Sequence, residues 1–311
     1  MSATPLLSGV VPALVTPFGA DGGVAVDVVS KLVEFHMEAG VNGFYVCGNT
    51  GEGFAMTSEE RKQMADATVK AAAGRVPVAV HVGACPIAEA VDLAKHAADV
   101  GAAAISSVVP TDKPNDLGAA VEYFTELGSA STLPFYVYWV AKDADGTVLA
   151  RQYLEAVKAV PNLAGIKFTD SNFFMFQQLH SLAPAVLGRG LNAMTGPDEM
   201  ALAGLVMGSH GAIGSTYNTQ PKLNVMMHKA FAEGRIPEAM ELQARCNHMI
   251  ALFFEHCNLT QKGTNIVAGI KAIYRARGIE VGHARPATGS ITAEQEQALI
   301  AATDACEWKV E

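Results

Sequence analysis

Short apolar runs rich in β-branched residues alternate along this chain with amphipathic stretches, one pair about every 30 residues. A rhythm in which the apolar period changes from 2 to 3.6 is typical of βα units. The pattern predicts eight strands, at residues 10–17, 43–47, 76–82, 104–109, 135–140, 163–169, 191–195 and 211–215. Helices are predicted between them, for example at 58–73, 87–100, 117–127 and 150–160.

Eight tightly connected βα units in about 230 residues favour an α/β fold of the closed (β/α)8, or TIM-barrel, type. An open doubly wound sheet is the alternative. After the eighth strand the pattern predicts helices only, at 222–233, 237–257, 262–277 and 292–307. We therefore expect a barrel over residues 1–234 and a C-terminal helical extension packed on it over residues 235–311.

Composition narrows the class of protein. No segment of the 311 residues approaches the roughly 18 uninterrupted apolar residues of a membrane span. The first five residues carry no basic part of a secretory signal, and five scattered cysteines without a CxxC pair indicate reduced thiols. A net charge of −9 leaves no basic stripe for a phosphate backbone. We expect a cytoplasmic protein whose partner is a small molecule, not a membrane or a nucleic acid.

Lys167 lies near the end of the predicted strand 163–169, with no acid before Asp170. By the period of two, its amine shares one face with Leu163 and Gly165. A buried, unpaired ammonium is costly, so an inward position favours the neutral amine, which is a nucleophile toward carbonyl carbon. The other interpretation is an ordinary lysine that reaches water at the strand end.

Tyr138 and a glycine-rich loop fall at the ends of other predicted strands, where the active face of a barrel forms. Tyr138 is one strand from Lys167, so its hydroxyl can move protons there, unless its ring only fills the core. The GNTGEG segment at 48–53 can cradle a carboxylate through backbone N–H groups and the Thr50 hydroxyl. The same segment can also be a plain tight turn.

Polar groups at the last two strands suit a hydroxyl-rich ligand. Asp198 and Glu199 follow the seventh strand and can accept hydrogen bonds from sugar hydroxyls, or simply begin a helix. The eighth strand continues as GSTYN at 214–218, where small residues leave room for such a ligand or form a turn. No HExxH motif or cysteine pair offers a metal site, so we expect no metal and no cofactor. His81 is expected in the core and four helical histidines on the surface: His36, His96, His180 and His228.

Together these segments resemble the dihydrodipicolinate synthase / N-acetylneuraminate lyase family of class I pyruvate aldolases, over nearly the whole chain. GIKFTD (165–170), GNTGEG (48–53) and Tyr138 carry the resemblance. GPDE (196–199) and IGSTYN (213–218) are similar to the sugar-contacting segments of the lyase branch and not to those of the synthase branch.

The resemblance implies a role for each matching residue. Lys167 would form a Schiff base with the keto acid and Tyr138 would transfer protons. Asn49 and Thr50 would hold the pyruvate carboxylate. The sugar portion would be held by five further residues: Thr169, Gly196, Asp198, Glu199 and Ser215.

The resemblance also implies an activity, the reversible cleavage of sialic acid to N-acetylmannosamine and pyruvate by a homotetramer. Three alternatives remain open at this point. One is a related pyruvate-dependent aldolase or dehydratase acting on a 2-keto-3-deoxy sugar acid, the second is a dihydrodipicolinate synthase-like enzyme, and the third is a non-catalytic sensor of a keto acid or sialic acid.

Several positions depart from the family pattern. Trp139 stands where members commonly have a proline, and Asn49 stands where they commonly have Ser or Thr. Pro110 is followed by no tyrosine that could reach a neighbouring subunit, and no arginine follows Tyr138 until Arg151, which argues against the synthase. We expect the polar loop 142–146 to influence which acyl or sugar group is accepted.

Overall fold

The computed structural model of the chain describes residues 6–83, 86–110, 115–140, 147–257 and 266–306. Within these residues eight parallel strands pair in the order β1-β8-β7-β6-β5-β4-β3-β2, and a bridge between Ala13 and Tyr45 joins the two ends. The strands are β1 (Gly9–Pro12), β2 (Phe44–Val46), β3 (Val78–His81), β4 (Ala104–Ser107), β5 (Phe135–Val140), β6 (Leu163–Thr169), β7 (Asn192–Thr195) and β8 (Gly211–Gly214). The predicted closed barrel is confirmed, and the open sheet is wrong.

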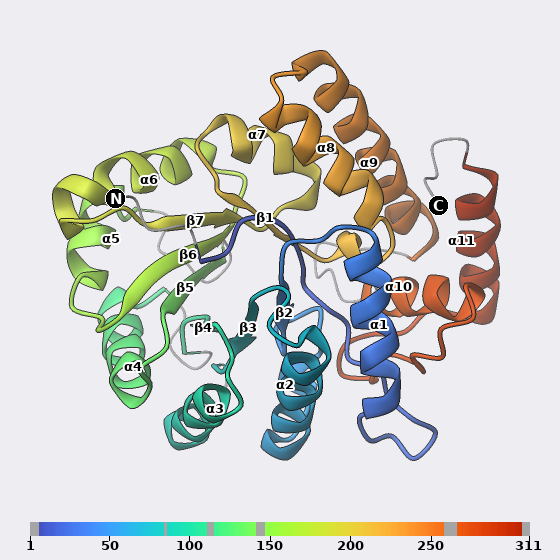
Figure 1. Cartoon of the computed structure of the whole chain (residues 1–311), viewed down its shortest axis with the longest axis horizontal. Coiled ribbons are helices and arrows are strands. Elements are labelled where there is room, and N and C mark those ends of the chain that lie inside the picture. Colours follow the sequence, from blue (N-terminus) through green and yellow to red (C-terminus); the bar gives the residue numbers. More distant parts are fainter. Residues whose placement is uncertain (1–5, 84–85, 111–114, 141–146, 258–265, 307–311) are drawn as a thin grey trace.

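Helices surround the barrel on its outer side (Figure 1). The ring consists of α1 (Val26–Glu38), α2 (Ser58–Ala72), α3 (Ile87–Asp99), α4 (Leu117–Ala130), α5 (Ala150–Val157), α6 (Phe173–Leu187), α7 (Ala201–Val206) and α8 (Pro221–Ala232). Within the described residues, short 3-10 turns follow three of the strands: η1 (Gly53–Ala55) after β2, η3 (Asp198–Met200) after β7 and η4 (Thr216–Asn218) after β8. The capping box expected at the start of α2 is present, because Thr57 and Glu60 bond each other's backbone N–H groups.

Three more helices follow the barrel: α9 (Ile236–His256), α10 (Ile266–Ala276) and α11 (Ala293–Ala305). Figure 1 shows them in orange and red beside α8 and α1, and α9 packs along α8. This arrangement corrects one expectation. His36 of α1 is fully buried, not on the surface, and its Nε2 is 2.7 Å from the Tyr274 hydroxyl of α10. Helix amphipathicity alone marks one buried face and cannot show that a second layer covers another.

The barrel interior is filled by aliphatic and aromatic side chains that point inward, mostly from alternate positions of the strands. This inner cluster is separate from the larger core between sheet and helices, as expected for a packed barrel and not a pore. Its members are Leu7, Val11, Ala13, Tyr45, Ala79, Ala104, Tyr136, Met194 and Ile213. Because the interior is filled at depth, a ligand can enter only at the mouth, where the strands end.

Strand β6 contains an irregularity below Lys167. Its pairing with β5 passes from Phe135 opposite Leu163 to Tyr136 opposite Gly165, so Ala164 is skipped. Leu163 therefore packs in the outer core, and the expectation that it shares a face with Lys167 is wrong. A Cβ on Gly165 would lie 2.2 Å from the Tyr136 ring, so glycine is required here.

Candidate active site

Lys167 is buried at the barrel mouth, with 5% of its side chain area exposed. Its Nζ lies 4.4 Å from the ring centroid of Tyr45 and 4.2 Å from that of Tyr138. Tyr138 is directly opposite Lys167 in the pairing of β5 with β6. No salt bridge of the described residues involves this amine. The amine therefore lies between two aromatic side chains at the end of the barrel where the strands terminate.

Tyr45 and His81 surround the lysine together with Tyr138. The rings of Tyr45, His81 and Tyr138 lie within 6.3 Å of one another, centroid to centroid. The Tyr45 hydroxyl donates to Ser106 Oγ at 3.2 Å, and the Val108 N–H donates to His81 Nε2 at 3.2 Å. Burial raises the pKa of the Tyr45 phenol well above its usual value. Burial lowers the pKa of His81, and the nearby charges of Arg61 and Lys167 lower it further. The predicted core position of His81 is confirmed, and its lowered pKa favours the neutral imidazole.

The GNTGEG loop folds into a tight turn above β2. The Glu52 N–H donates to the Asn49 carbonyl at 3.0 Å, and the Thr16 hydroxyl donates to the Gly51 carbonyl at 2.6 Å. Gly53 lies so close to the preceding strand that a Cβ would come within 1.9 Å of the Cys47 carbonyl oxygen. The turn therefore depends on glycine for close backbone approach.

Thr50 and Ser215 bring the second and eighth strands together at the mouth. Their hydroxyl oxygens are 2.7 Å apart, and Thr50 is buried. Asn49 precedes Thr50 in the turn, and its side chain is exposed. One of these two hydroxyls donates to the other. Either could instead donate its hydrogen to the carboxylate of a bound ligand.

Asp198 belongs to η3 and lies next to the segment that follows β8. Its Oδ2 accepts hydrogen bonds from the Thr216 N–H and hydroxyl, each at 2.7 Å. Its Oδ1 is buried and has no hydrogen-bond partner among the described residues. Burial raises the pKa of Asp198 to about 6, although Thr216 and the more distant charge of Lys167 act in the other direction. Glu199, the next residue, has an exposed side chain.

Thr169 and Gly196 lie against each other between β6 and β7. A Cβ on Gly196 would be 1.8 Å from Thr169 Oγ1, and that hydroxyl is buried without a hydrogen-bond partner in the described part of the chain. The Gly196 N–H donates to the Phe168 carbonyl at 2.7 Å. The pair thus leaves an unused donor beside the lysine strand.

Helix α9 supports η3 from behind. Gln243 donates to the Asp198 carbonyl at 3.2 Å and accepts from the Leu202 N–H at 2.9 Å. Asn247 donates to the Glu199 carbonyl at 3.1 Å. The backbone of the two acids is therefore held by side chains from beyond the barrel.

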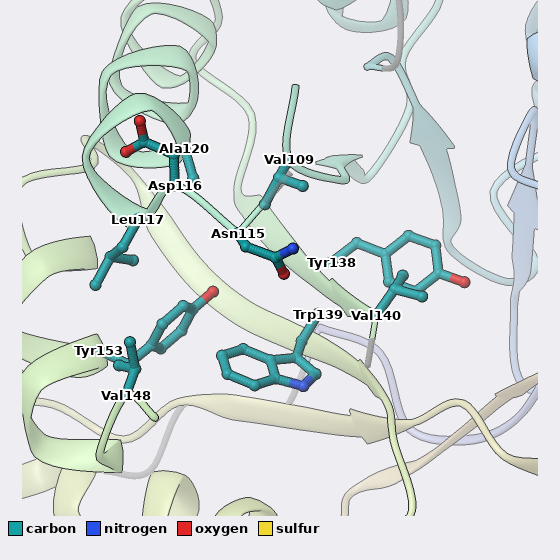
Figure 2. A pocket seen from close by; sticks show the side chains of 10 residues that line it. All are labelled: Val109, Asn115, Asp116, Leu117, Ala120, Tyr138, Trp139, Val140, Val148 and Tyr153. Carbon is teal, nitrogen blue, oxygen red and sulfur yellow. The ribbon is translucent and has the colours of Figure 1, made fainter. Parts of the chain in front are cut away.

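Trp139 points away from the barrel axis, on the opposite side of β5 from the Tyr138 ring (Figure 2). Its indole N–H donates to Asp170 Oδ2 at 3.0 Å, and its ring stacks on Phe168. A cavity of about 30 Å³ lies beside it, lined largely by apolar side chains from α4, α5 and the ends of β4 and β5, among them Tyr153. The polar loop 142–146, expected to influence substrate choice, lies outside the described residues.

The structure brings most of the predicted site residues to one end of the barrel. Lys167 and Tyr138 are in contact, Thr50 touches Ser215, and Thr169 adjoins Gly196. Tyr45 was not predicted, although it points inward between outward-facing neighbours two residues before Cys47, which is the signal of an interior position. No group of three or more potential metal ligands occurs in the described ranges.

Comparison with models of known protein families gives a match over almost the whole length of the chain. Residues 6–305 match the model of the dihydrodipicolinate synthetase family. The chain belongs to this family. Within the described residues, no helix is both long and apolar enough to cross a membrane.

Several relatives are N-acetylneuraminate lyases. The chain is 33% identical over 279 residues to that of Rhizobium meliloti, covering 90% of this chain and 88% of the relative. It is 35% identical over 254 residues to N-acetylneuraminate lyase A of Xenopus laevis, covering 80% of this chain and 82% of the relative. The solved structure of Proteus mirabilis N-acetylneuraminate lyase superposes with a TM-score of 0.87 at 31% identity, over 97% of this chain and 99% of the other.

Proposed function

We propose that this chain is an N-acetylneuraminate lyase, a class I aldolase that cleaves sialic acid reversibly to N-acetylmannosamine and pyruvate. The observation that carries the proposal is the place of Lys167 Nζ, buried between the rings of Tyr45 and Tyr138 at the mouth of the barrel. The names of its relatives give the substrate. The buried acceptor of Asp198 on the same rim suits the hydroxyl groups of a sugar.

In the proposed reaction, Lys167 Nζ attacks the C2 ketone of open-chain sialic acid, and loss of water gives a protonated imine. The imine accepts the electron pair of the C3–C4 bond as the C4 hydroxyl loses its proton. N-acetylmannosamine then leaves, and an enamine of pyruvate stays on the lysine. Protonation at C3 and hydrolysis release pyruvate and restore the amine. Tyr138, in contact with Lys167, carries the proton between these groups.

The remaining residues of the site bind the substrate in this proposal. Asn49, through its backbone, and Thr50 hold the carboxylate, which makes attack by the lysine effectively intramolecular. Five residues hold the sugar portion: Thr169, Gly196, Asp198, Glu199 and Ser215. The unpartnered oxygens of Thr169 and Asp198 support this role, because buried polar atoms without partners are uncommon unless a ligand or water completes them.

Reductive trapping tests the catalytic lysine. Borohydride with pyruvate should attach one reduced pyruvyl group to Lys167, located by peptide mass spectrometry. The Lys167→Met variant should give no adduct. A wild-type protein that forms no adduct, or forms it on another lysine such as the buried Lys271, would contradict the proposal.

A panel of keto acids tests the substrate. Pyruvate release should be fastest from N-acetylneuraminate and slower from a 2-keto-3-deoxy sugar acid of six carbons. Faster release from the sugar acid would place the chain in a neighbouring branch of the family. Consumption of pyruvate with aspartate semialdehyde would point to the synthase reaction, and binding without turnover would point to a sensor.

We further propose a cytoplasmic homotetramer. The support for four subunits is family resemblance, and the support for the compartment is the scattered set of cysteines without a disulfide framework. Light scattering after size-exclusion chromatography tests the first proposal, and cell fractionation tests the second.

A further inference from the structure

A fully buried ion pair connects the C-terminal extension to the carboxylate-binding turn. Lys271 of α10 and Glu52 of the GNTGEG loop both have side chains with 0% exposure, and Lys271 Nζ is 2.6 Å from Glu52 Oε1. The same amine donates to the His283 carbonyl at 3.1 Å and lies 4.2 Å from the ring centroid of Phe18. The proposed reaction uses neither Lys271 nor Glu52.

Glu52 is held in place by more than the lysine. Its Oε2 accepts the Arg285 N–H at 2.7 Å, so both carboxylate oxygens are bound by the extension. The Arg285 guanidinium bonds the Glu60 carboxylate at the start of α2 and the Ala55 carbonyl at the end of η1. Several hydrogen bonds and ion pairs thus connect residues 52–60, which include the end of the carboxylate-binding turn, to the C-terminal extension.

The backbone of Glu52 has a strained conformation that surrounding contacts must hold. Glu52 has a φ of 58°, in the left-handed region that residues with a side chain seldom adopt. Its N–H closes the turn by donating to the Asn49 carbonyl, and Thr50 lies between them. An unfavourable φ persists when surrounding contacts fix it, and such strain is concentrated at functional sites.

Stability alone gives little reason for two charges here. A buried ion pair is often no more stabilising than apolar groups of the same volume, because both charges lose their hydration. Burial lowers the pKa of Lys271 to about 8, even though Glu52 acts to raise it. What an ion pair supplies and an apolar pair does not is an attraction between two particular atoms, here Lys271 Nζ and Glu52 Oε1 at 2.6 Å, which favours one position of the Glu52 side chain.

We propose that Lys271 and Glu52 are positioning residues that hold the turn from Asn49 to Glu52 in the shape that binds the substrate carboxylate. The inference rests on the proposed function, since it assumes that this turn receives the carboxylate of pyruvate. Neither residue touches the substrate. The extension acts through Lys271 on the backbone of the turn, and the turn acts on the keto acid.

The test compares a ketone that has a carboxylate with one that does not. Both pyruvate and hydroxyacetone have a ketone that a lysine amine can convert to an imine, and in this proposal only pyruvate, through its carboxylate, needs the turn. For each ketone, the concentration that gives half-maximal borohydride trapping is measured in wild type, Lys271→Met and Arg275→Met, together with the thermal midpoint. Arg275 is the matched control, one turn further along α10, where it pairs with Glu296 within the extension.

Lys271→Met should raise the half-trapping concentration of pyruvate by about tenfold or more and leave that of hydroxyacetone within about twofold, because a small misplacement of a binding group weakens binding strongly. Arg275→Met should lower the thermal midpoint without changing the ratio of the two ketones. Unchanged pyruvate trapping in Lys271→Met, or an equal change for both ketones, would overturn the inference. Failure of wild type to trap pyruvate would instead refute the proposed function.

A second variant covers the case in which Lys271→Met does not fold because Glu52 is left as an unpaired buried charge. Glu52→Gln combined with Lys271→Met removes both charges and keeps the volumes. This double variant should be soluble and should show the same selective loss of pyruvate trapping. Normal trapping of pyruvate by the double variant would overturn the inference. Insolubility would overturn it as well, by showing that the charges serve the fold and not the turn.

Discussion

Replacement of Asp198 by asparagine should stabilise the fold at neutral pH while it impairs the reaction. The pKa of this carboxyl is raised from 3.8 to about 6, chiefly by burial. Between these values the folded chain binds more protons than the unfolded chain, so stability falls as pH rises through this window and stays lower above it. At about 1.4 kcal/mol for each pH unit, ionisation of Asp198 costs about 3 kcal/mol at pH 7.5.

Asparagine removes this cost and keeps the shape. Its amide oxygen can accept the two hydrogen bonds that Thr216 now gives to Oδ2. Its amide nitrogen would occupy the position of Oδ1, which has no partner in the described structure, at a cost of about 1 kcal/mol. The expected net gain at pH 7.5 is therefore about 2 kcal/mol, or a rise of about 3 °C in Tm for a chain of this length.

Thermal unfolding of wild type and Asp198→Asn at several pH values measures this gain. The advantage of the variant should be about 2 kcal/mol above pH 7, about 0.6 kcal/mol near pH 5 and absent near pH 4.5, where the cost of ionising Asp198 no longer exceeds the cost of the unpaired amide. At the same time, cleavage of sialic acid should slow, because a charged acceptor for sugar hydroxyls is lost. A variant that is less stable than wild type at pH 7.5, or an advantage that does not change with pH, would refute the reasoning.

Three further substitutions test the packing around the lysine. Tyr138→Phe should lower kcat about a hundredfold or more, by loss of the proton carrier, while borohydride still traps pyruvate; an unchanged kcat would contradict the role. Gly165→Ala should yield little soluble protein, because its Cβ would lie 2.2 Å from the Tyr136 ring, and a well-folded variant would show that the ring can move. Trp139→Phe should lower the free energy of unfolding by about 1 kcal/mol through loss of the bond to Asp170, with the aromatic stacking retained. Chemical denaturation measures that loss, and an unchanged denaturation midpoint would count against it.

Local patterns were enough to predict the barrel and the strand that carries Lys167. The strands at 135–140 and 163–169 begin and end as predicted, because each is an apolar run bounded by turn residues. The face on which Leu163 lies could not be predicted, since one skipped residue changes the parity of everything before it. Periodicity carries no information about where such an irregularity falls.

Contacts between residues far apart in the sequence could not be predicted from local patterns. The burial of His36 depends on Tyr274, and the surroundings of Glu52 depend on Lys271, each pair more than 200 residues apart. Neither partner is marked by its own neighbours in sequence. The candidate site could be assembled from strand ends because the barrel brings all of them to one face, whereas the supports behind the site follow no such rule.

The side chains of Gln243 and Asn247 connect the C-terminal extension directly to the candidate site. They occupy the carbonyl groups of Asp198 and Glu199, two of the residues proposed to bind the sugar. The short turn between α8 and α9 therefore joins two parts of the chain that depend on each other through these bonds. We expect an exchange of this extension between relatives to shift the backbone of both residues, so a helix outside the barrel becomes a place to change the proposed sugar preference.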